Sequence, residues 1–312
     1  MRDQADRLRQ LALQLRWRDK EKPVSPVIKA ETIDAAPEPE PIKKGPRIIA
    51  VTSGKGGVGK TNLTANLALS LSQVGYRTVL LDADLGLANV DVLFGIVPQH
   101  TLKDVIDGSL QISEILTPGP LGLTIIAGGN GITELADLNE QQVERFIRSL
   151  DALDELYDFI LIDTGAGIGK AVLGFVLAAH EIIVITTPEP TSITDAYATI
   201  KAVCNRRQDA EIRLVINRVA NPVEAQQAYD KIRMAAERFL GVGIPLLGSI
   251  PDDPCVVKAV MAQQPFSLCF PHSEATLRLK EMASALIPQR EIEVPVATGV
   301  RSFFSRVISL FR

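Results

Sequence analysis

The stretch RIIAVTSGKGGVGKT, residues 47–61, decides the fold class. It begins as an apolar run typical of a buried parallel strand and continues into a glycine-rich loop, residues 54–61, of the form G-x-x-x-x-G-K-[ST]. In such loops the glycines let backbone N–H groups converge on phosphate oxygens, and the following helix adds the positive end of its dipole. The stretch therefore predicts a phosphate-binding loop. One lysine suffices for that role, yet this loop contains both Lys55 and Lys60.

Similar apolar runs recur along the chain and alternate with helical segments. The predicted strands are 47–53, 78–84, 123–129, 159–165, 181–188, 212–219 and 245–251. The predicted helices include 60–74, 139–156, 191–206 and 223–240. This alternation predicts an α/β fold, a doubly wound and mostly parallel sheet with helices on both faces. Ligands of such sheets bind at the carboxyl ends of the strands.

The two ends of the chain differ in composition from the α/β region. Residues 1–21 have the periodicity of an amphipathic helix rich in arginine, and residues 22–46 are a proline-rich stretch that predicts an extended linker. We expect the nucleotide-binding domain at 47–287 and a second linker at 288–299. Residues 300–312 return to helical periodicity and predict a second amphipathic helix.

Charge and cysteine content exclude several classes of function. The net charge is −4, so no global field attracts the protein to nucleic acid, and we expect no direct nucleic-acid partner. Cys204, Cys255 and Cys269 form no C-x-x-C pair, which argues against a zinc or iron–sulfur site and fits a reducing cytosol. The N-terminus is charged rather than apolar, and no apolar run approaches the roughly 20 residues of a membrane-spanning helix.

The polar residues around the loop predict ATP and Mg²⁺ as ligands. Lys60 is expected to reach the β- and γ-phosphates, and Thr61 to bind Mg²⁺. Asp163 ends the run FILID and is the natural outer-sphere partner of the metal. Asp82 and Asp84 end another predicted strand on one face, where Asp82 can join the metal site and Asp84 can orient the attacking water. Each carboxylate taken alone is equally compatible with a helix cap or a solvated strand end.

The remaining contacts to the nucleotide follow from the same edge of the sheet. The residues expected to surround the phosphates are Gly54, Lys55, Gly56, Gly57, Val58, Gly59, Lys60, Thr61 and Asn62. The guanine-specific motif N-K-x-D is absent, which favours adenine, with Asn217 and Arg218 at its edge and Pro251 against its ring. The loops 82–91 and 163–169 follow the carboxylates, and we expect them to reorganise when the γ-phosphate is lost.

These motifs resemble the MinD/ParA family of deviant Walker-A ATPases. The resemblance rests on KGGVGKT (55–61), DADLGLANVD (82–91), ILIDTGAG (160–167) and INR (216–218). It implies that Lys55 reaches across a homodimer interface to the partner's nucleotide, so that Lys55, Lys60 and Asp84 act together in an ATP-dependent dimer. An outward ammonium group needs an anion to meet it, and a second triphosphate is such an anion. The alternative is an ordinary surface lysine.

The N-terminal residues resemble one group within the family, the flagellar-number regulators known as FlhG, YlxH or FleN. The matching residues are Asp3, Gln4, Ala5, Leu8 and Arg9. This resemblance implies that the segment stimulates the GTPase FlhF, and that switch-complex (C-ring) proteins or a flagellar transcription factor are further candidate partners. The alternative is an amphipathic helix folded back on the domain.

The C-terminal residues predict a membrane-binding helix. Their apolar stripe includes Phe303, Phe304, Val307, Ile308 and Phe311, and arginines flank it. Bulky apolar residues beside arginines are typical of a helix lying on an anionic membrane surface. The alternative is that the helix docks in a groove of the protein itself. Docking and membrane binding are compatible if the helix is docked in the monomer and released in the dimer. We therefore expect a cytoplasmic protein that is peripheral at the inner face of the membrane when ATP is bound.

Other functions on the same fold remain open. A MinD-like division-site ATPase also has a C-terminal amphipathic helix, but it begins near its first strand. A ParA-type DNA-segregation ATPase needs a basic face, which the net charge of −4 disfavours. An iron–sulfur carrier needs the missing C-x-x-C pair. A small-molecule kinase has no need of terminal helices, and a tyrosine kinase needs a tyrosine-rich tail, whereas the last tyrosine here is Tyr229.

Overall fold

A computed structural model describes residues 45–311 except 85–88, 130, 136–137 and 288–298. The chain divides into two compact units, Met1–Glu38 and Pro39–Arg312, and all described residues belong to the second. The segment expected to stimulate FlhF therefore lies outside the described residues, as do nearly all of the two predicted linkers.

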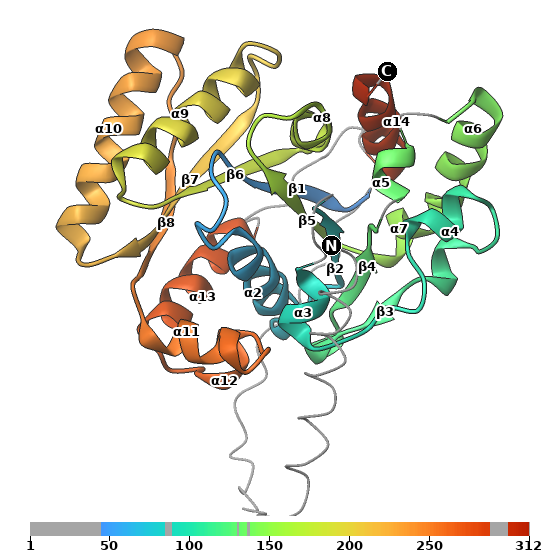
Figure 1. Cartoon of the computed structure of the whole chain (residues 1–312), viewed down its shortest axis with the longest axis horizontal. Coiled ribbons are helices and arrows are strands. Elements are labelled where there is room, and N and C mark those ends of the chain that lie inside the picture. Colours follow the sequence, from blue (N-terminus) through green and yellow to red (C-terminus); the bar gives the residue numbers. More distant parts are fainter. Residues whose placement is uncertain (1–44, 85–88, 130, 136–137, 288–298, 312) are drawn as a thin grey trace, which may run out of the picture. The chain divides into compact units, whose positions relative to one another are not determined.

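A single sheet forms the centre of the described unit (Figure 1). Its strands are β1 (Arg47–Ser53), β2 (Thr78–Ala83), β3 (Thr117–Pro118), β4 (Thr124–Ala127), β5 (Phe159–Ala166), β6 (Glu181–Thr186), β7 (Glu211–Val219) and β8 (Leu246–Pro251). The order across the sheet is β3-β4-β2-β5-β1-β6-β7-β8, and every neighbouring pair is parallel except β3 with β4. The predicted fold class is therefore confirmed.

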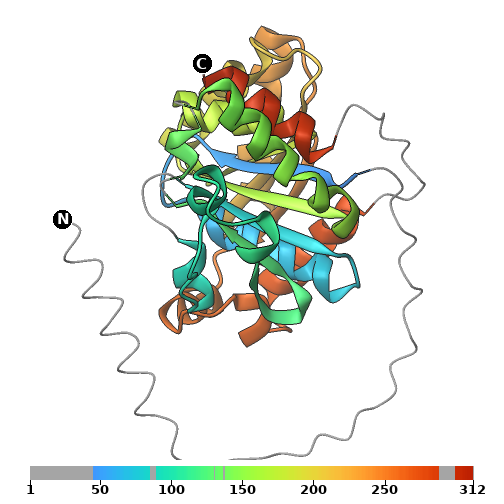
Figure 2. The same cartoon turned by 90° about the vertical axis from the view of Figure 1, so that its right-hand side faces the viewer.

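Helices cover both faces of the sheet (Figure 2). One layer consists of α2 (Lys60–Gln73), α3 (Val90–Phe94), α11 (Pro254–Met261), α12 (Phe266–Cys269) and α13 (Glu274–Leu286). The other contains α4 (Leu102–Ile106), α5 (Gly131–Glu134), α6 (Glu140–Ser149), α7 (Asp151–Leu156), α8 (Lys170–Ala178), α9 (Pro190–Cys204), α10 (Pro222–Leu240) and α14 (Val300–Phe311). Alternate residues of each strand enter the two cores, as Ile48 and Ile49 of β1 do.

The sequence prediction is wrong in detail at residues 139–156. Two helices, α6 and α7, occupy this range instead of one. At Leu150 the backbone amide bonds to the carbonyl of Ile147, three residues back, so the α-helical ladder is interrupted. Leu150 at the break and Leu153 in the first turn of α7 are both buried in the core.

The C-terminal helix α14 packs on the domain against α8, α6 and α7. Its apolar stripe is buried in an aromatic cluster, in which the Phe304 ring lies 5.4 Å from Phe146 and the Phe311 ring lies 5.9 Å from Phe175. A side chain at Gly174 of α8 would collide with the Phe311 ring, since its Cβ would lie 2.2 Å from that ring. The docked arrangement is therefore the one that the structure adopts.

The start of α14 is fixed by a carboxylate of α7. Asp154 Oδ1 accepts a hydrogen bond of 2.7 Å from the backbone amide of Val300 and thus caps the helix. Gly299 leaves room for this cap, because a Cβ there would lie 2.4 Å from Asp154 Oδ2. Among the described helices, none has the length and apolar character needed to span a bilayer.

Candidate functional site

The glycine-rich loop joins β1 to α2 in the predicted position. Gly57 and Gly59 have φ angles of 77° and 95°, which L side chains rarely adopt. Gly54 is fixed by crowding instead, because a Cβ there would lie 2.2 Å from the backbone of Asp195. These constraints hold the loop in a tight curve over the N-terminus of α2, where an anion is favoured.

Asp163, at the carboxyl end of β5, organises the two side chains that follow the loop. Lys60 Nζ donates to its Oδ1 over 2.9 Å, and Thr61 Oγ1 donates to its Oδ2 over 2.6 Å. Thr64, one turn further along α2, donates to Oδ1 over 3.2 Å. Asp163 is fully buried; burial raises its pKa, whereas Lys60 and the hydroxyl donors act in the opposite direction.

Asp82 and Asp84 lie beside this cluster but have different surroundings. Asp82 is buried and accepts hydrogen bonds from the amides of Asp84 (3.2 Å) and Val90 (3.3 Å). Burial, and then the nearby Asp163, raise the pKa of Asp82 to about 7. Asp84 is more exposed, and its carboxylate lies 3.9 Å from Lys60 Nζ, at the mouth of the site. Residues 85–88 of the predicted switch loop lie outside the described residues.

These side chains suit a nucleotide-bound Mg²⁺. Thr61 and Asp163 provide hydroxyl and carboxylate oxygens, which are the donors that Mg²⁺ prefers. In nucleotide sites Mg²⁺ commonly takes one or two protein ligands and completes its shell with water and phosphate oxygens. The donor set therefore fits the predicted metal role of Thr61 and Asp163, while the carboxylate of Asp82 is already engaged with the backbone of its own loop.

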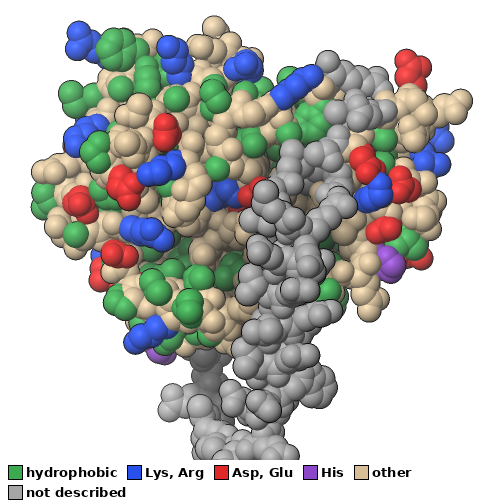
Figure 3. All heavy atoms as spheres, viewed as in Figure 1, with side chains coloured by type: hydrophobic (Ala, Val, Ile, Leu, Met, Phe, Trp, Pro, Cys, Tyr) green, Lys and Arg blue, Asp and Glu red, His purple; other side chains and the backbone are tan. Residues whose placement is uncertain are grey.

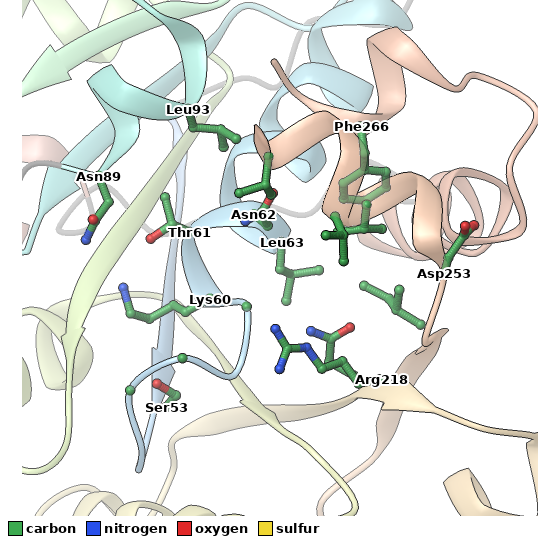
Figure 4. Close-up of a pocket in the computed structure, with 18 of the residues that line it drawn as sticks. Ser53, Lys60, Thr61, Asn62, Leu63, Asn89, Leu93, Arg218, Asp253 and Phe266 are labelled. Carbon is green, nitrogen blue, oxygen red and sulfur yellow. The ribbon is translucent and has the colours of Figure 1, made fainter. Parts of the chain in front are cut away.

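A pocket of about 520 Å³ extends from the loop toward α11 (Figure 4). Its lining includes Lys60, Thr61 and Asp84 of the phosphate site together with Arg218 and Pro251 of the predicted base site. The apolar lining was not predicted from the sequence: Leu63, Leu93, Val256, Val257, Val260, Met261 and Phe266. The pocket therefore places an apolar wall beside the residues predicted to hold the base.

Asn217 links the predicted base site to the phosphate loop. Its Nδ2 donates to the carbonyl oxygen of Val58 over 2.7 Å and lies 2.4 Å from the position of a Cβ on Gly59. This bond uses one of the two N–H donors of the side-chain amide, and the amide oxygen is the atom able to accept a hydrogen bond from the amino group of adenine. The next residue, Arg218, has a φ of 56° at a register shift between β7 and β8, a strained conformation of the kind found at binding sites.

Lys55 lies on the outer rim of the loop, apart from the Lys60 cluster. Its Nζ donates to Glu189 Oε2 over 2.9 Å and to Thr191 Oγ1 over 3.3 Å, and its side chain is 42% exposed. The hydrogen bond from Lys55 lowers the pKa of Glu189. Glu189 and Thr191 were not predicted from the sequence, although both follow the predicted strand 181–188, and polar residues at the carboxyl end of such a strand are expected to face a ligand.

Comparison with known proteins assigns the family. A family model of the ParA group, described as NUBPL iron-transfer P-loop NTPase, matches residues 45–287. The chain is 43% identical over 237 residues to the antiactivator FleN of Pseudomonas aeruginosa, which covers 76% of this chain and 85% of FleN. The chain belongs to the ParA/MinD family of P-loop NTPases.

Two further ParA/MinD-type proteins extend this similarity. The flagellum site-determining protein YlxH of Helicobacter pylori is 33% identical over 279 residues, covering 85% of this chain and 91% of YlxH. The septum site-determining protein MinD of Pyrococcus horikoshii, solved with Mg-ADP, matches with a TM-score of 0.63 and 25% identity over 80% of this chain and 99% of that one. The predicted resemblance is thus confirmed, and membership of the family supports ATPase activity. Although the family model refers to iron transfer, this ParA/MinD-family chain has no C-x-x-C pair.

Proposed function

We propose that the protein is an ATP-hydrolysing switch that dimerises around ATP, attaches to a membrane through α14 and regulates the number or placement of flagella. The observation that carries the proposal is the position of Lys55. Its side chain projects from the rim of the loop toward Glu189, not toward the Lys60–Asp163 cluster. It therefore does not take part in the cluster expected to hold the phosphates of the nucleotide bound by the same subunit. A charge in that place suits the nucleotide of a second subunit.

In this proposal the described residues divide the work of hydrolysis. The loop amides, the N-terminus of α2 and Lys60 hold the phosphates and offset their negative charge. Thr61 and Asp163 would hold Mg²⁺, which would polarise the phosphate oxygens. Asp84, at the mouth of the site, orients the attacking water and accepts its proton. Asn217, Arg218 and Pro251, which line the pocket, hold the adenine.

Dimerisation requires Lys55 to leave Glu189. The Lys55–Glu189 ion pair is exposed, and screening by solvent leaves such pairs with little net contribution to stability. A partner's triphosphate carries several negative charges and offers stronger, charge-assisted contacts. The exchange therefore favours the dimer when ATP is bound and the monomer after the γ-phosphate is lost.

Membrane attachment follows if dimerisation releases α14. The helix presents bulky apolar residues on one side and arginines at its border, which is the composition of an interfacial helix. One such helix binds lipid weakly, but two on a dimer act together and gain about 10²-fold or more in avidity. On the face seen in Figure 3, the described acidic and basic side chains are interspersed, with no extended basic field suited to DNA.

The flagellar role and the stimulation of FlhF rest on relatives and on the sequence of residues 1–21. FleN and YlxH are named an antiactivator and a flagellum site-determining protein, and both align over more than three quarters of their own length. Further candidate partners are switch-complex proteins and a flagellar transcription factor. A GTPase assay of FlhF with a peptide of residues 1–21 tests this part of the proposal. Stimulation supports it, and no stimulation would favour a division-site role of the MinD type.

The membrane part has a separate test. Removal of residues 300–312 should abolish ATP-dependent sedimentation with vesicles of anionic lipid, while ATP hydrolysis in solution stays within about twofold, because α14 lies apart from the nucleotide pocket. Sedimentation of the truncated protein at the level of the intact chain would refute the assignment of α14 as the membrane anchor.

A further inference from the structure

Arg306 differs from the other residues at the docked face of α14. It is half-buried at the border of the apolar stripe, and its Nε makes a long hydrogen bond of 3.4 Å to the carbonyl of Ser302. Its Nη2 is buried and has no hydrogen-bond partner within the described part of the chain. Because a guanidinium group stays protonated in proteins, this is an incompletely paired charge that is partly removed from water.

A second positive charge lies next to Arg306. Arg207, after α9, donates hydrogen bonds to the carbonyls of Leu177 (3.1 Å), Ala179 and His180 (3.2 Å) and thereby closes the C-terminal end of α8. These bonds fix the Arg207 guanidinium in place. Burial and this neighbour both lower the pKa of Arg306. The docked helix therefore places Arg306 within electrostatic reach of a like charge that is held in position, and the carboxylate of Asp209, 3.8 Å from Arg207, offsets that charge only from an exposed position.

An apolar side chain of similar length would fit this position at lower cost. Burying an unpaired charge opposes the packing of the surrounding groups, and replacing buried charges by apolar residues is often neutral or stabilising. The neighbouring residues Phe303 and Val307 are almost fully buried, so the groove offers an apolar environment to such a substitute. Arg306 thus weakens the docking of α14 on the domain, whereas the apolar stripe strengthens it.

We propose that Arg306 is an electrostatic counterweight, which keeps the docking of α14 weak enough for an anionic lipid surface to withdraw the helix. The phosphate groups of such a surface supply the hydrogen-bonding partner that Arg306 lacks in the groove. This inference rests on the proposed membrane role of α14. The inference adds that Arg306 both weakens docking and strengthens lipid binding. Both effects shift the equilibrium of α14 from the docked to the membrane-bound state.

The test is amide hydrogen exchange of α14 in the full-length protein without lipid or nucleotide. Docked amides exchange only when the helix opens, so the exchange rate reports the undocked fraction. Arg306→Met should slow exchange in α14 by about tenfold, because it removes the unpaired charge and adds apolar contact. Arg301→Met is the matched control, since it removes the same charge from an exposed position of the same helix and should not slow exchange.

Arg306→Leu is a second apolar variant for the same measurement. If α14 exchanges at least as fast in both Arg306→Met and Arg306→Leu as in the wild type, the proposal is overturned. Sedimentation with anionic vesicles adds a second readout. Both Met variants lose one arginine for lipid, but Arg306→Met should bind less than Arg301→Met because its helix is also held more tightly. Equal losses would contradict the counterweight. Since the exchange experiment contains no lipid, its failure is distinguishable from failure of the membrane role, which the truncation at residue 300 tests.

Discussion

At the scale of single residues, Asp163 joins the parts of the site that the sequence assigned separately. Lys60, Thr61 and Thr64 all donate to its carboxylate, so the phosphate-binding lysine and the expected magnesium ligand share one buried anchor. The burial of Asp163 raises its pKa, and Lys60 offsets this by stabilising the charged form. The arrangement places a lysine and a hydroxyl group beside the phosphate loop in fixed orientations.

Asn217 provides a prediction at this scale. Asn217→Ala removes the hydrogen bond to the Val58 carbonyl and leaves the loop without its brace from β7. Loss of one partner of this partly buried hydrogen bond costs about 1–3 kcal/mol, so ATP should bind roughly 5- to 150-fold more weakly. Calorimetric titration with ATP and GTP measures both this loss and the expected decline in preference for ATP.

Asn221→Ala is the matched control for that experiment. Asn221 caps α10 through a hydrogen bond from the Glu224 amide and does not line the pocket. Its loss should lower stability by about 0.5–2 kcal/mol without weakening nucleotide binding. If Asn217→Ala binds ATP as tightly as Asn221→Ala does, the brace has no role in the site.

The sequence was sufficient to bring together residues that belong to local motifs, while their roles stay predictions. Lys60, Thr61 and Asp163 were predicted because strand, loop and helix context limits what those residue types can do. Glu189 and Thr191 were missed because their contact with Lys55 joins segments that are far apart in the chain. The apolar wall from α11 was missed for the same reason, since an amphipathic helix pattern does not tell which residues line a pocket.

At the scale of elements, the strands were the most predictable feature. Continuous runs of Val, Ile and Leu are buried on both faces of a parallel sheet and have few other stable placements. The short helices α3, α4 and α5 were not predicted, because four or five residues are too few to establish helical periodicity. The sequence predicted α14 as an amphipathic helix but left its docking open, since the groove is formed by residues of α6, α7 and α8.

Gly174 gives a test of that docking. Gly174→Ala places a methyl group where the Phe311 ring now lies and should displace the end of α14, although alanine by itself favours the helix α8. Exposure of the aromatic stripe should raise sedimentation with anionic vesicles in the absence of ATP and lower the unfolding temperature.

Gly243→Ala serves as the control, because nothing lies within 4 Å of the added methyl group. It should leave both sedimentation and unfolding temperature as in the wild type. If Gly174→Ala and Gly243→Ala give the same nucleotide-free sedimentation, the groove does not restrain α14.

At the scale of the whole molecule, three features take part in the proposed cycle: the nucleotide pocket, Lys55 and α14. The nucleotide pocket lies at the carboxyl edge of the sheet, Lys55 lies on its rim, and α14 is docked on the opposite helical layer from α2. ATP is proposed to act on the rim by bringing two copies together, and the two released helices to act on the membrane. Hydrolysis assisted by Asp84 is proposed to return the molecule to the docked monomer.

Lys55→Ala separates nucleotide binding from assembly. Lys55 makes its contacts with Glu189 and Thr191, whereas the Lys60–Asp163 cluster is independent of it. The variant should therefore bind ATP within about an order of magnitude of the wild type, because additivity holds for groups that share no partner. It should not form an ATP-dependent dimer.

The most direct measurement is the molecular mass in solution of Asp84→Ala with Mg²⁺ and ATP, by light scattering, with and without Lys55→Ala. The Asp84→Ala background prevents hydrolysis from dissolving the dimer, and Lys231→Ala, which removes an exposed lysine from α10, is the control. The account predicts a dimer for Asp84→Ala and for Asp84→Ala with Lys231→Ala, and a monomer once Lys55 is removed. A dimer that persists in Asp84→Ala with Lys55→Ala would contradict the account, because the second lysine of the loop would then be an ordinary surface charge.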